Sequence, residues 1–152
     1  MKKIGLCFGS LLLLIAFATG QNLQEVKGVY YADSVRFTGI CTTYYENGAI
    51  KMETAFKKGL KNGQFKIYSE GGQLQEIRSY KRNEMHGTWI TFNEKGVKIG
   101  EASYKNGQKH GRWLVWNDDG KLVYEMAYRK GKKRGTWKKF DENGVQIAAH
   151  KF

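Results

Sequence analysis

The sequence predicts an all-β protein, an elongated open antiparallel sheet of stacked β-hairpins built from 24-residue repeats. The first observation behind this prediction is a glycine at every 24th position along most of the chain. The second is that aromatic residues recur at fixed distances after each of these glycines. The third is an alternation of apolar and polar residues, which is typical of strands with unlike faces. Repeats of this size stack on their neighbours, so we expect function along a surface rather than in a cleft.

The repeats start at five evenly spaced residues, which we call the opening glycines: Gly39, Gly63, Gly87, Gly111 and Gly135. The fifth position after each is aromatic: Tyr44, Tyr68, Phe92, Trp116 and Phe140. The seventeenth is aromatic too: Phe56, Tyr80, Tyr104, Tyr128 and Phe152. The second is apolar: Cys41, Phe65, Trp89, Trp113 and Trp137. We therefore expect a repeat domain over residues 39–152, with repeats 39–62, 63–86, 87–110 and 111–134 and a partial repeat 135–152.

Each repeat is predicted to be a β-hairpin. An alternation with a period of two residues over 50–56 and 122–128 predicts its second strand. Dipeptides such as Asn47-Gly48 and Asp119-Gly120 join the two strands, and they predict two-residue turns with positive φ. A second connection leads to the next repeat, at 57–62, 81–86, 105–110 and 129–134. Proline is absent, which favours strands paired on both sides.

The second and fifth positions of a repeat, such as Trp89 and Phe92, are an odd number of residues apart. In a regular strand their side chains face opposite sides of the sheet. Either both faces carry aromatic rows, or a bulge after the opening glycine returns both positions to one face. The sequence leaves these two alternatives open.

The repeated text resembles the bacterial variant of MORN (membrane occupation and recognition nexus) repeats. The matching pattern is Gly-x-Trp-x-x-aromatic, then Asn-Gly, then aromatic-x-x-Gly-x-x-His-Gly, as in residues 104–113. The resemblance implies an open, twisted antiparallel sheet that acts as a scaffold or binding surface, in some cases at membranes, and some members carry an antitoxin-like label. The second repeat departs from the pattern at Asn83, where others have glycine, so Asn83 is expected to adopt a left-handed conformation.

Residues 1–20 are predicted to be a secretory signal peptide. Lys2 and Lys3 precede an apolar run over residues 4–17, and small residues follow before Gln21. An uncleaved N-terminal anchor is the alternative. With cleavage the protein would be periplasmic or at the cell surface, and Cys41 would be its only cysteine, a small buried apolar residue without a disulfide.

Residues 21–38 are out of register with the repeats, and we expect them to form an N-terminal cap that protects the first repeat. At the other end, the strand over residues 145–152 is expected to be an edge. This edge suggests edge-to-edge homodimerisation as a hypothesis.

Charge is unevenly distributed, beyond the formal net charge of +12. The connections between repeats carry twelve basic residues against Glu84 alone, and we call these twelve the basic edge: Lys57, Lys58, Lys61, Lys81, Arg82, Lys105, Lys109, Arg129, Lys130, Lys132, Lys133 and Arg134. The hairpin turns carry Lys95 and seven acidic residues, which we call the acidic edge: Glu46, Glu70, Glu94, Asp118, Asp119, Asp141 and Glu142. The two kinds of turn should lie on opposite edges of the sheet. Solvation of charged turns is the alternative explanation.

The function that we predict is a non-catalytic exported scaffold that binds a protein in the cell envelope. The basic edge is the candidate contact surface, and Trp89, Trp113 and Trp137 are either contact residues or core. No catalytic residue, metal site or cofactor is expected, because the chain lacks the common catalytic motifs. His86 and His110 occupy equivalent repeat positions and should lie about 10 Å apart, too far to share a metal.

In two alternative functions the chain is also a binding protein, but its partner is different. One is a module for anionic surfaces such as acidic lipid or polysaccharide, because Lys and Arg near such surfaces are stabilising. The other is an antitoxin-like partner protein. Nucleic acid is not an expected ligand of an exported chain.

Overall fold

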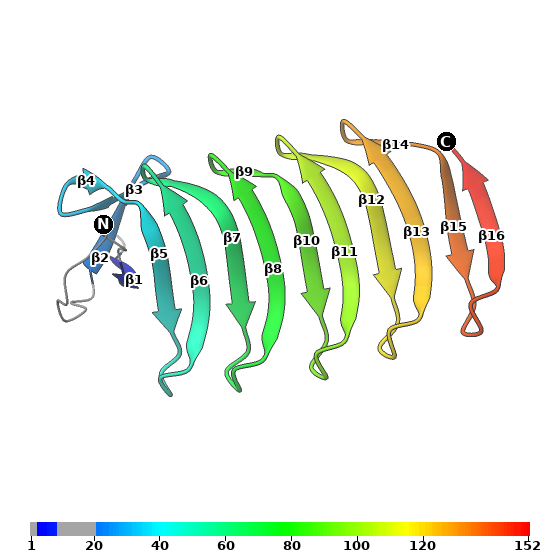
Figure 1. Ribbon diagram of the computed structural model, residues 1–152, viewed down its shortest axis with the longest axis horizontal. Coiled ribbons are helices and arrows are strands. Elements are labelled where there is room, and N and C mark those ends of the chain that lie inside the picture. Colours follow the sequence, from blue (N-terminus) through cyan, green and yellow to red (C-terminus); the bar gives the residue numbers. More distant parts are fainter. Residues whose placement is uncertain (1–2, 9–20) are drawn as a thin grey trace. The chain divides into compact units, whose positions relative to one another are not determined.

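A computed structural model of the chain describes residues 3–8 and 21–152 (Figure 1). The chain forms two compact units. Unit 1 comprises Met1–Gln73 and Tyr80–Glu84, and unit 2 comprises Leu74–Ser79 and Met85–Phe152. No helix occurs among the described residues, and so none there is long and apolar enough to span a membrane.

Unit 1 is an antiparallel sheet with the strand order β7-β6-β5-β1-β2-β3-β4. Its strands are β1 (Lys3–Phe8), β2 (Gln21–Val26), β3 (Val29–Ala32), β4 (Val35–Arg36), β5 (Gly39–Tyr44), β6 (Ile50–Lys57) and β7 (Leu60–Tyr68). The next two strands, β8 (Leu74–Lys81) and β9 (Glu84–Met85), are divided between the units.

Unit 2 continues with the strand order β8-β10-β11-β12-β13-β15-β16, and β14 pairs with β13. Its strands are β10 (Gly87–Phe92), β11 (Lys98–Lys105), β12 (Gln108–Trp116), β13 (Leu122–Arg129), β14 (Lys132–Lys133), β15 (Thr136–Phe140) and β16 (Gln146–Lys151). Neighbouring strands pair antiparallel, which confirms the predicted open antiparallel sheet of consecutive hairpins within each unit.

The tight two-residue turns lie at the connections between repeats. Lys58 and Gly59 both have positive φ, 53° and 78°, and so do Lys130 and Gly131, 52° and 78°. Two positive φ values in succession define the turn whose twist matches that of the flanking strands. Asn83 has a φ of 70°, which confirms the left-handed conformation expected of it.

The turns inside the repeats are of another kind, and the prediction of two-residue turns there was wrong. In Asn47-Gly48 only the glycine has a positive φ, 84°. The Gly48 N–H donates to the Tyr45 carbonyl at 3.0 Å, and the Tyr45 N–H donates to the Ala49 carbonyl at 2.9 Å. This is a longer hairpin loop that ends in a glycine bulge. The error arose because Asn-Gly suits both turn types, and the strand register decides between them.

The register also decides between the two alternatives for the aromatic positions. On β10 no extra residue separates Trp89 from Phe92, so they face opposite sides of the sheet. The bulge lies on the partner strand, where Thr91 pairs with Gly100 and Phe92 with Lys98, leaving Ile99 unpaired. Both faces of the sheet therefore carry aromatic residues.

The largest buried cluster lies in unit 1, where residues 21–38 meet the first repeat. It consists of Leu23, Tyr30, Ala32, Phe37, Cys41 and Phe56. Backbone hydrogen bonds close this contact, from the Tyr30 N–H to the Gly59 carbonyl at 2.8 Å and from the Gly59 N–H to the Phe37 carbonyl at 2.7 Å. The N-terminal segment thus contacts both the first hairpin and its tight turn.

The predicted signal peptide falls mostly outside the described residues, since residues 1–2 and 9–20 are not described. Residues 3–8 form β1, which pairs with β2 and β5 and places Cys7 opposite Cys41 in the register. Cys41 is 4% exposed, as its predicted burial required. It is disulfide-bonded in the full-length chain, whereas the prediction of a cysteine without a disulfide concerns the chain that starts at Gln21. That prediction depended on removal of residues 1–20.

Candidate binding edge and aromatic ladder

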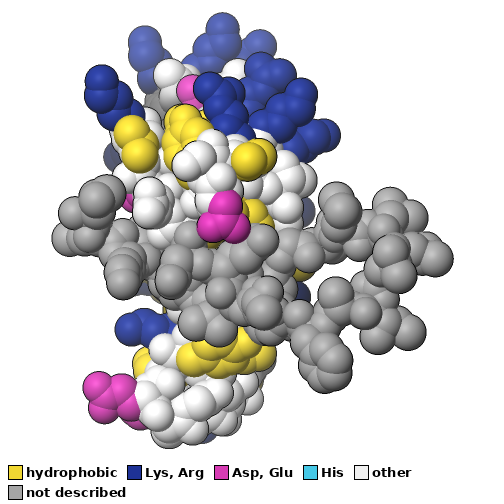
Figure 2. All heavy atoms as spheres, turned by 90° about the vertical axis from the view of Figure 1, so that its left-hand side faces the viewer, with side chains coloured by type: hydrophobic (Ala, Val, Ile, Leu, Met, Phe, Trp, Pro, Cys, Tyr) yellow, Lys and Arg dark blue, Asp and Glu magenta, His cyan; other side chains and the backbone are white. Residues whose placement is uncertain are grey.

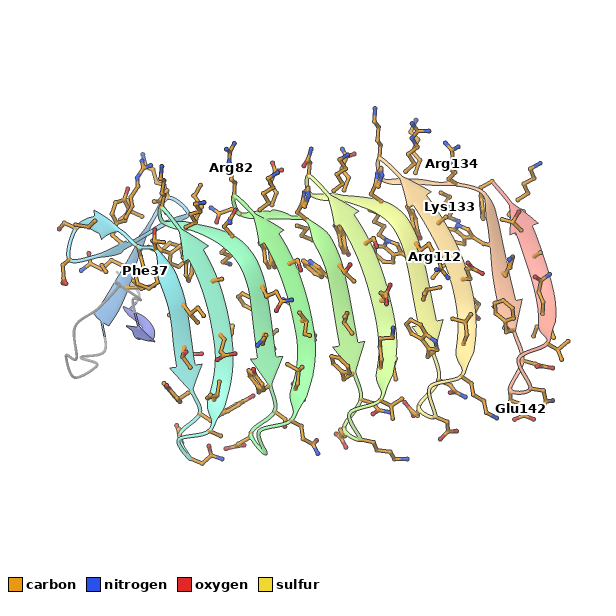
Figure 3. All side chains as sticks on the ribbon, viewed as in Figure 1. Phe37, Arg82, Arg112, Lys133, Arg134 and Glu142 are labelled. Carbon is orange, nitrogen blue, oxygen red and sulfur yellow. The ribbon has the colours of Figure 1, made fainter. Side chains whose placement is uncertain are left out.

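The structure places the basic-edge residues at one end of the strands in each unit, at and beside the tight turns. The acidic-edge residues lie in the loops at the other end. Figure 3 shows this separation within unit 2, where Arg134 and Glu142 lie at opposite ends of the strands. Figure 2 shows Lys and Arg side chains gathered at one end of the face turned to the viewer.

Successive tight turns are joined by backbone hydrogen bonds. In unit 2 the Gly131 N–H donates to the Lys109 carbonyl, and the Gly107 N–H donates to the Met85 carbonyl, both at 2.9 Å. In unit 1 the Asn83 N–H donates to the Lys61 carbonyl at 2.9 Å. The backbone that carries the basic edge is therefore held at a fixed spacing within each unit.

Asn83 adds two side-chain hydrogen bonds to this connection. Its Oδ1 accepts from the Lys61 N–H at 2.7 Å, and its Nδ2 donates to the Gly28 carbonyl at 2.8 Å. A glycine could not make these bonds, so the departure from the repeat pattern ties the turn of the N-terminal cap to the repeats.

All basic-edge side chains are exposed except that of Lys61, which is half-buried. None of them forms an ion pair with another described residue. Nine of the twelve line two surface hollows. The hollow in unit 1 has a volume of about 470 Å³ and is lined by Lys57, Lys58, Leu60, Asn62, Lys81 and Arg82. The hollow in unit 2 has a volume of about 330 Å³ and is lined by Arg129, Lys130, Lys132, Lys133 and Arg134.

Three tryptophans alternate with two tyrosines and a phenylalanine in a continuous row of rings on one face of unit 2. We call this row the aromatic ladder: Trp89, Tyr104, Trp113, Tyr128, Trp137 and Phe152. Neighbouring ring centroids are 4.6 to 5.2 Å apart and the rings are tilted against each other. Such pairs add stability beyond the area that they bury.

Each tryptophan of the ladder is also tied to the backbone of the preceding strand. The indole N–H groups of Trp89, Trp113 and Trp137 donate to the carbonyls of Ser79, Ser103 and Ala127 at 3.0, 2.9 and 3.1 Å. All three side chains are half-buried. The sequence left open whether these tryptophans are contact residues or core. Each has features of both, because its indole N–H is bonded within the sheet while part of its ring is exposed.

Three of the twelve basic-edge residues lie over aromatic rings. The Lys109 ammonium is 4.4 Å from the ring centroid of Trp113 and 4.9 Å from that of Tyr128. Lys61 lies 5.7 Å from both Phe65 and Tyr80 in unit 1. Lys133 occupies the same position in the fourth repeat, and Met85 in the second. Sequence reasoning missed this role, although the recurrence of Lys or Met two residues before an opening glycine was a readable signal.

The other face of unit 2 carries ion pairs that the sequence analysis did not predict. Glu125 lies 3.4 Å from Arg112 and 3.5 Å from Lys138. Lys98 pairs with Glu101 at 2.9 Å and lies 4.2 Å from the ring centroid of Trp116. The signal was the glutamate fourteen residues after the opening glycine, at Glu53, Glu101 and Glu125.

Two tyrosines of unit 1 have strongly raised pKa values. Burial raises the pKa of Tyr68 to about 12, with a further contribution from its hydrogen bond to Glu53. Burial also raises the pKa of Tyr30 to about 12, helped by the nearby Glu25. In unit 2 burial raises the pKa of Tyr128. All three phenols therefore stay protonated at neutral pH.

Among the described residues, no group of three or more His, Cys, Asp or Glu side chains could hold a metal ion. The buried Nδ1 atom of His86 has no hydrogen-bond partner in the described part of the chain. The turns, the ladder and the ion pairs offer surfaces for binding.

The sequence also matches a family of known proteins. The sequence model of the MORN repeat variant matches residues 37–58, 61–82, 85–106 and 109–130, together more than half of the chain. Each match starts two residues before an opening glycine. No curated protein matches the chain. MORN repeats are in general non-catalytic modules that bind proteins or membranes. The chain belongs to the MORN repeat variant family.

Proposed function

We propose that this chain is a non-catalytic scaffold, exported to the cell envelope, that binds a partner protein with an acidic surface along its basic edge. The observation that supports this proposal most is the state of the basic-edge side chains. They are mostly exposed, and none forms an ion pair with a described residue. An acidic partner would supply the counter-charges that the chain itself does not.

The spacing of the turns suits a partner that contacts several of them at once. Neighbouring hairpins place equivalent turns about 10 Å apart, two strand spacings. This distance is close to the Debye length of about 8 Å at physiological salt, so repulsion between turns is weak. A partner that spans two turns of a unit is attracted by both, and its association rate should fall as salt rises.

Export is the part of the proposal that depends on residues 1–20. Basic residues followed by an apolar run and small residues are the features of a secretory signal peptide. N-terminal sequencing of protein recovered from the envelope of the source organism tests this part. Export with cleavage predicts a mature protein that starts at Gln21, whereas an intact N-terminus would contradict cleavage.

Co-purification with matched variants tests the binding role. Lys130→Glu/Lys132→Glu reverses two basic-edge charges at residues that contact no aromatic ring of the described part of the chain. Lys95→Glu/Lys121→Glu reverses two charges at the loops of the opposite end and is the control. We expect the first variant to lose the partner protein from envelope extract and the control to retain it. Equal capture by both variants would remove the basic edge from the proposal.

The same cations would also attract acidic lipid or an anionic polysaccharide. Recovery of lipid or polysaccharide without protein, and its loss at high salt, would replace the protein partner by an anionic surface. An antitoxin-like role is a special case of the protein-binding scaffold, and the identity of the captured protein distinguishes it.

A further inference from the structure

The tight turn at residues 129–134 differs from its counterparts in the other repeats. Arg129 stands where the other repeats have Lys57, Lys81 and Lys105. Arg134 stands where they have Asn62, His86 and His110. Only this turn carries two guanidinium groups, and it carries no acidic residue.

Three backbone interactions hold this turn in place. Arg129 pairs with Lys132 across the hairpin. The Gly131 N–H donates to the Lys109 carbonyl at 2.9 Å, and the Arg134 N–H donates to the Ala127 carbonyl at 3.0 Å. The bases of both arginine side chains are therefore held in place, which lowers the entropy lost when a ligand binds.

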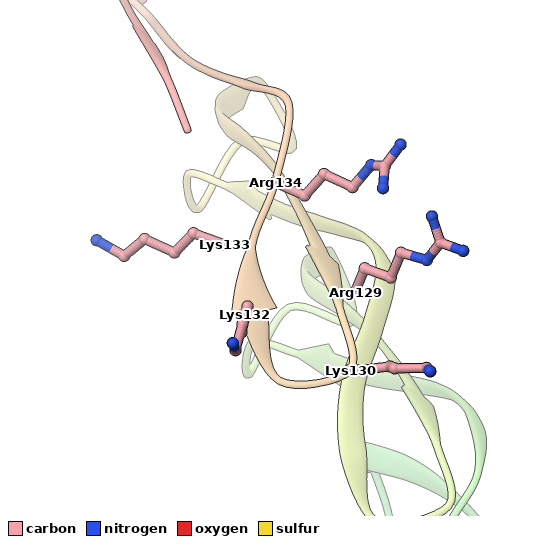
Figure 4. Close-up of a pocket in the computed structure, with 5 residues that line it drawn as sticks. All are labelled: Arg129, Lys130, Lys132, Lys133 and Arg134. Atoms are coloured by element: carbon pink, nitrogen blue, oxygen red, sulfur yellow. The ribbon is translucent and has the colours of Figure 1, made fainter.

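The side chains divide into two groups. Figure 4 shows Arg129, Lys130 and Arg134 extending to one side of the turn and Lys133 to the other. Lys133 is occupied, because its ammonium lies 4.6 Å from the ring centroids of both Trp137 and Phe152. Arg129, Lys130 and Arg134 are exposed and make no ion pair with a described residue. The cations that remain for a ligand are the guanidinium groups of Arg129 and Arg134 and the ammonium groups of Lys130 and Lys132.

Guanidinium and ammonium groups bind carboxylates differently. The planar fork of an arginine donates two parallel hydrogen bonds to one carboxylate, whereas a lysine acts as a compact, strongly hydrated point charge. Two such forks beside one hollow favour a ligand with carboxylates at a defined spacing over one that offers diffuse negative charge.

We propose that Arg129 and Arg134 form a binding site for carboxylates of an extended acidic peptide. This inference rests on the proposed function, because the peptide would be the segment of the partner protein that contacts the basic edge. The peptide runs across the strand ends of unit 2, from this turn toward the turn that carries Lys105 and Lys109. Three extended residues span about 10 Å, the spacing of adjacent turns. Acidic residues three positions apart therefore reach both turns.

The probe for this proposal is a short synthetic peptide with glutamate at every third position, titrated against the purified protein at low salt. The test variant is Arg129→Lys/Arg134→Lys, which keeps both charges and removes both forks. We expect its affinity for the peptide to fall about tenfold, the size of the charge-assisted bonds at stake. Arg112→Lys, which makes the same exchange at a residue that pairs with Glu125 outside the basic edge, and Lys121→Arg, in the loop at the opposite end of the strands, are the controls. Both should keep affinity within about twofold.

The outcomes separate this inference from the proposed function. Unchanged peptide affinity in Arg129→Lys/Arg134→Lys would overturn the inference while leaving a basic edge that binds by charge alone. Tighter binding of inorganic tripolyphosphate than of the peptide, with the same dependence on both arginines, would also overturn it, because the site would then take phosphate. Failure of the proposed function would instead be seen in the envelope capture experiment, where reversal of Lys130 and Lys132 would change nothing.

Discussion

The ammonium group of Lys133 lies 4.6 Å from the ring centroid of Trp137. In the preceding repeat Lys109 lies 4.4 Å from Trp113. A cation over a ring face is attracted by the negative face of the ring. Some of the positive charge at the turns therefore stabilises the aromatic ladder and is not free for a partner.

This relationship predicts the stability of variants at Lys109. Lys109→Met places there the residue that the second repeat has at Met85, and sulfur–aromatic contacts should replace the cation. We expect its free energy of unfolding to stay within about 0.5 kcal/mol of wild type. Lys109→Asp should lose about 1 kcal/mol or more, because a negative charge over the rings is repelled. Denaturant unfolding measures both, and equal stability of the two variants would show that the cation–ring contact is not stabilising.

Two glycines at equivalent turn positions separate backbone strain from crowding. Both have a φ of 78°, which costs a non-glycine residue about 1–2 kcal/mol. A methyl group at Gly59 would lie 2.6 Å from Cγ1 of Val29 and 2.8 Å from the Tyr30 carbonyl oxygen, whereas one at Gly131 would meet nothing within 4 Å. Gly131→Ala should therefore cost about 1–2 kcal/mol and Gly59→Ala about 3 kcal/mol or more. Thermal unfolding with equal losses for both variants would contradict the docking of the N-terminal cap on this turn.

Asn83 combines a left-handed backbone with two side-chain hydrogen bonds. Asn83→Gly keeps the backbone conformation and loses both bonds, so we expect a loss of about 1–2 kcal/mol. Asn83→Ala loses the bonds and adds backbone strain, so it should be about 1 kcal/mol less stable again. The order of denaturation midpoints should be wild type, glycine variant, alanine variant. An alanine variant as stable as wild type would show that neither feature contributes.

The raised pKa of Tyr68 predicts a loss of stability at alkaline pH. A tyrosine in the unfolded chain titrates near pH 10, and burial together with the hydrogen bond to Glu53 raises the pKa of Tyr68 to about 12 in the folded protein. The folded state binds this proton more tightly, so its contribution is complete below about pH 10 and is lost as pH rises toward about 12. Tyr68→Phe should lose less stability than wild type over this interval. Parallel pH profiles of unfolding free energy for the two proteins would contradict the shift.

The repeat period, the hairpins and the left-handed Asn83 could be predicted from the sequence because each follows from local patterning. The choice of turn type could not, since Asn-Gly suits two kinds of hairpin and only the pairing register separates them. The sequence also could not show whether Trp89 and Phe92 face the same side of the sheet. The answer depends on the pairing register, which places the bulge on the partner strand.

The sequence was enough to predict which charged residues form the candidate site. It was not enough to predict which other residues their side chains contact. Alternation and turn positions brought the basic residues to one end of the strands. They did not reveal that Lys61, Lys109 and Lys133 cover aromatic rings, because that depends on side-chain directions across neighbouring strands. The disulfide of Cys41 belongs to the full-length chain, whereas the sequence prediction concerned the chain after loss of residues 1–20.

Photo-crosslinking in the envelope of the source organism is the most direct test of the binding edge. A photoreactive amino acid replaces Lys130, at the tight turn of β13 and β14, or Lys121, in the loop at the opposite end of unit 2. Our account predicts an adduct with a partner protein from position 130 and none from position 121. The same adduct from both positions, or an adduct from position 121 alone, would contradict binding along the basic edge.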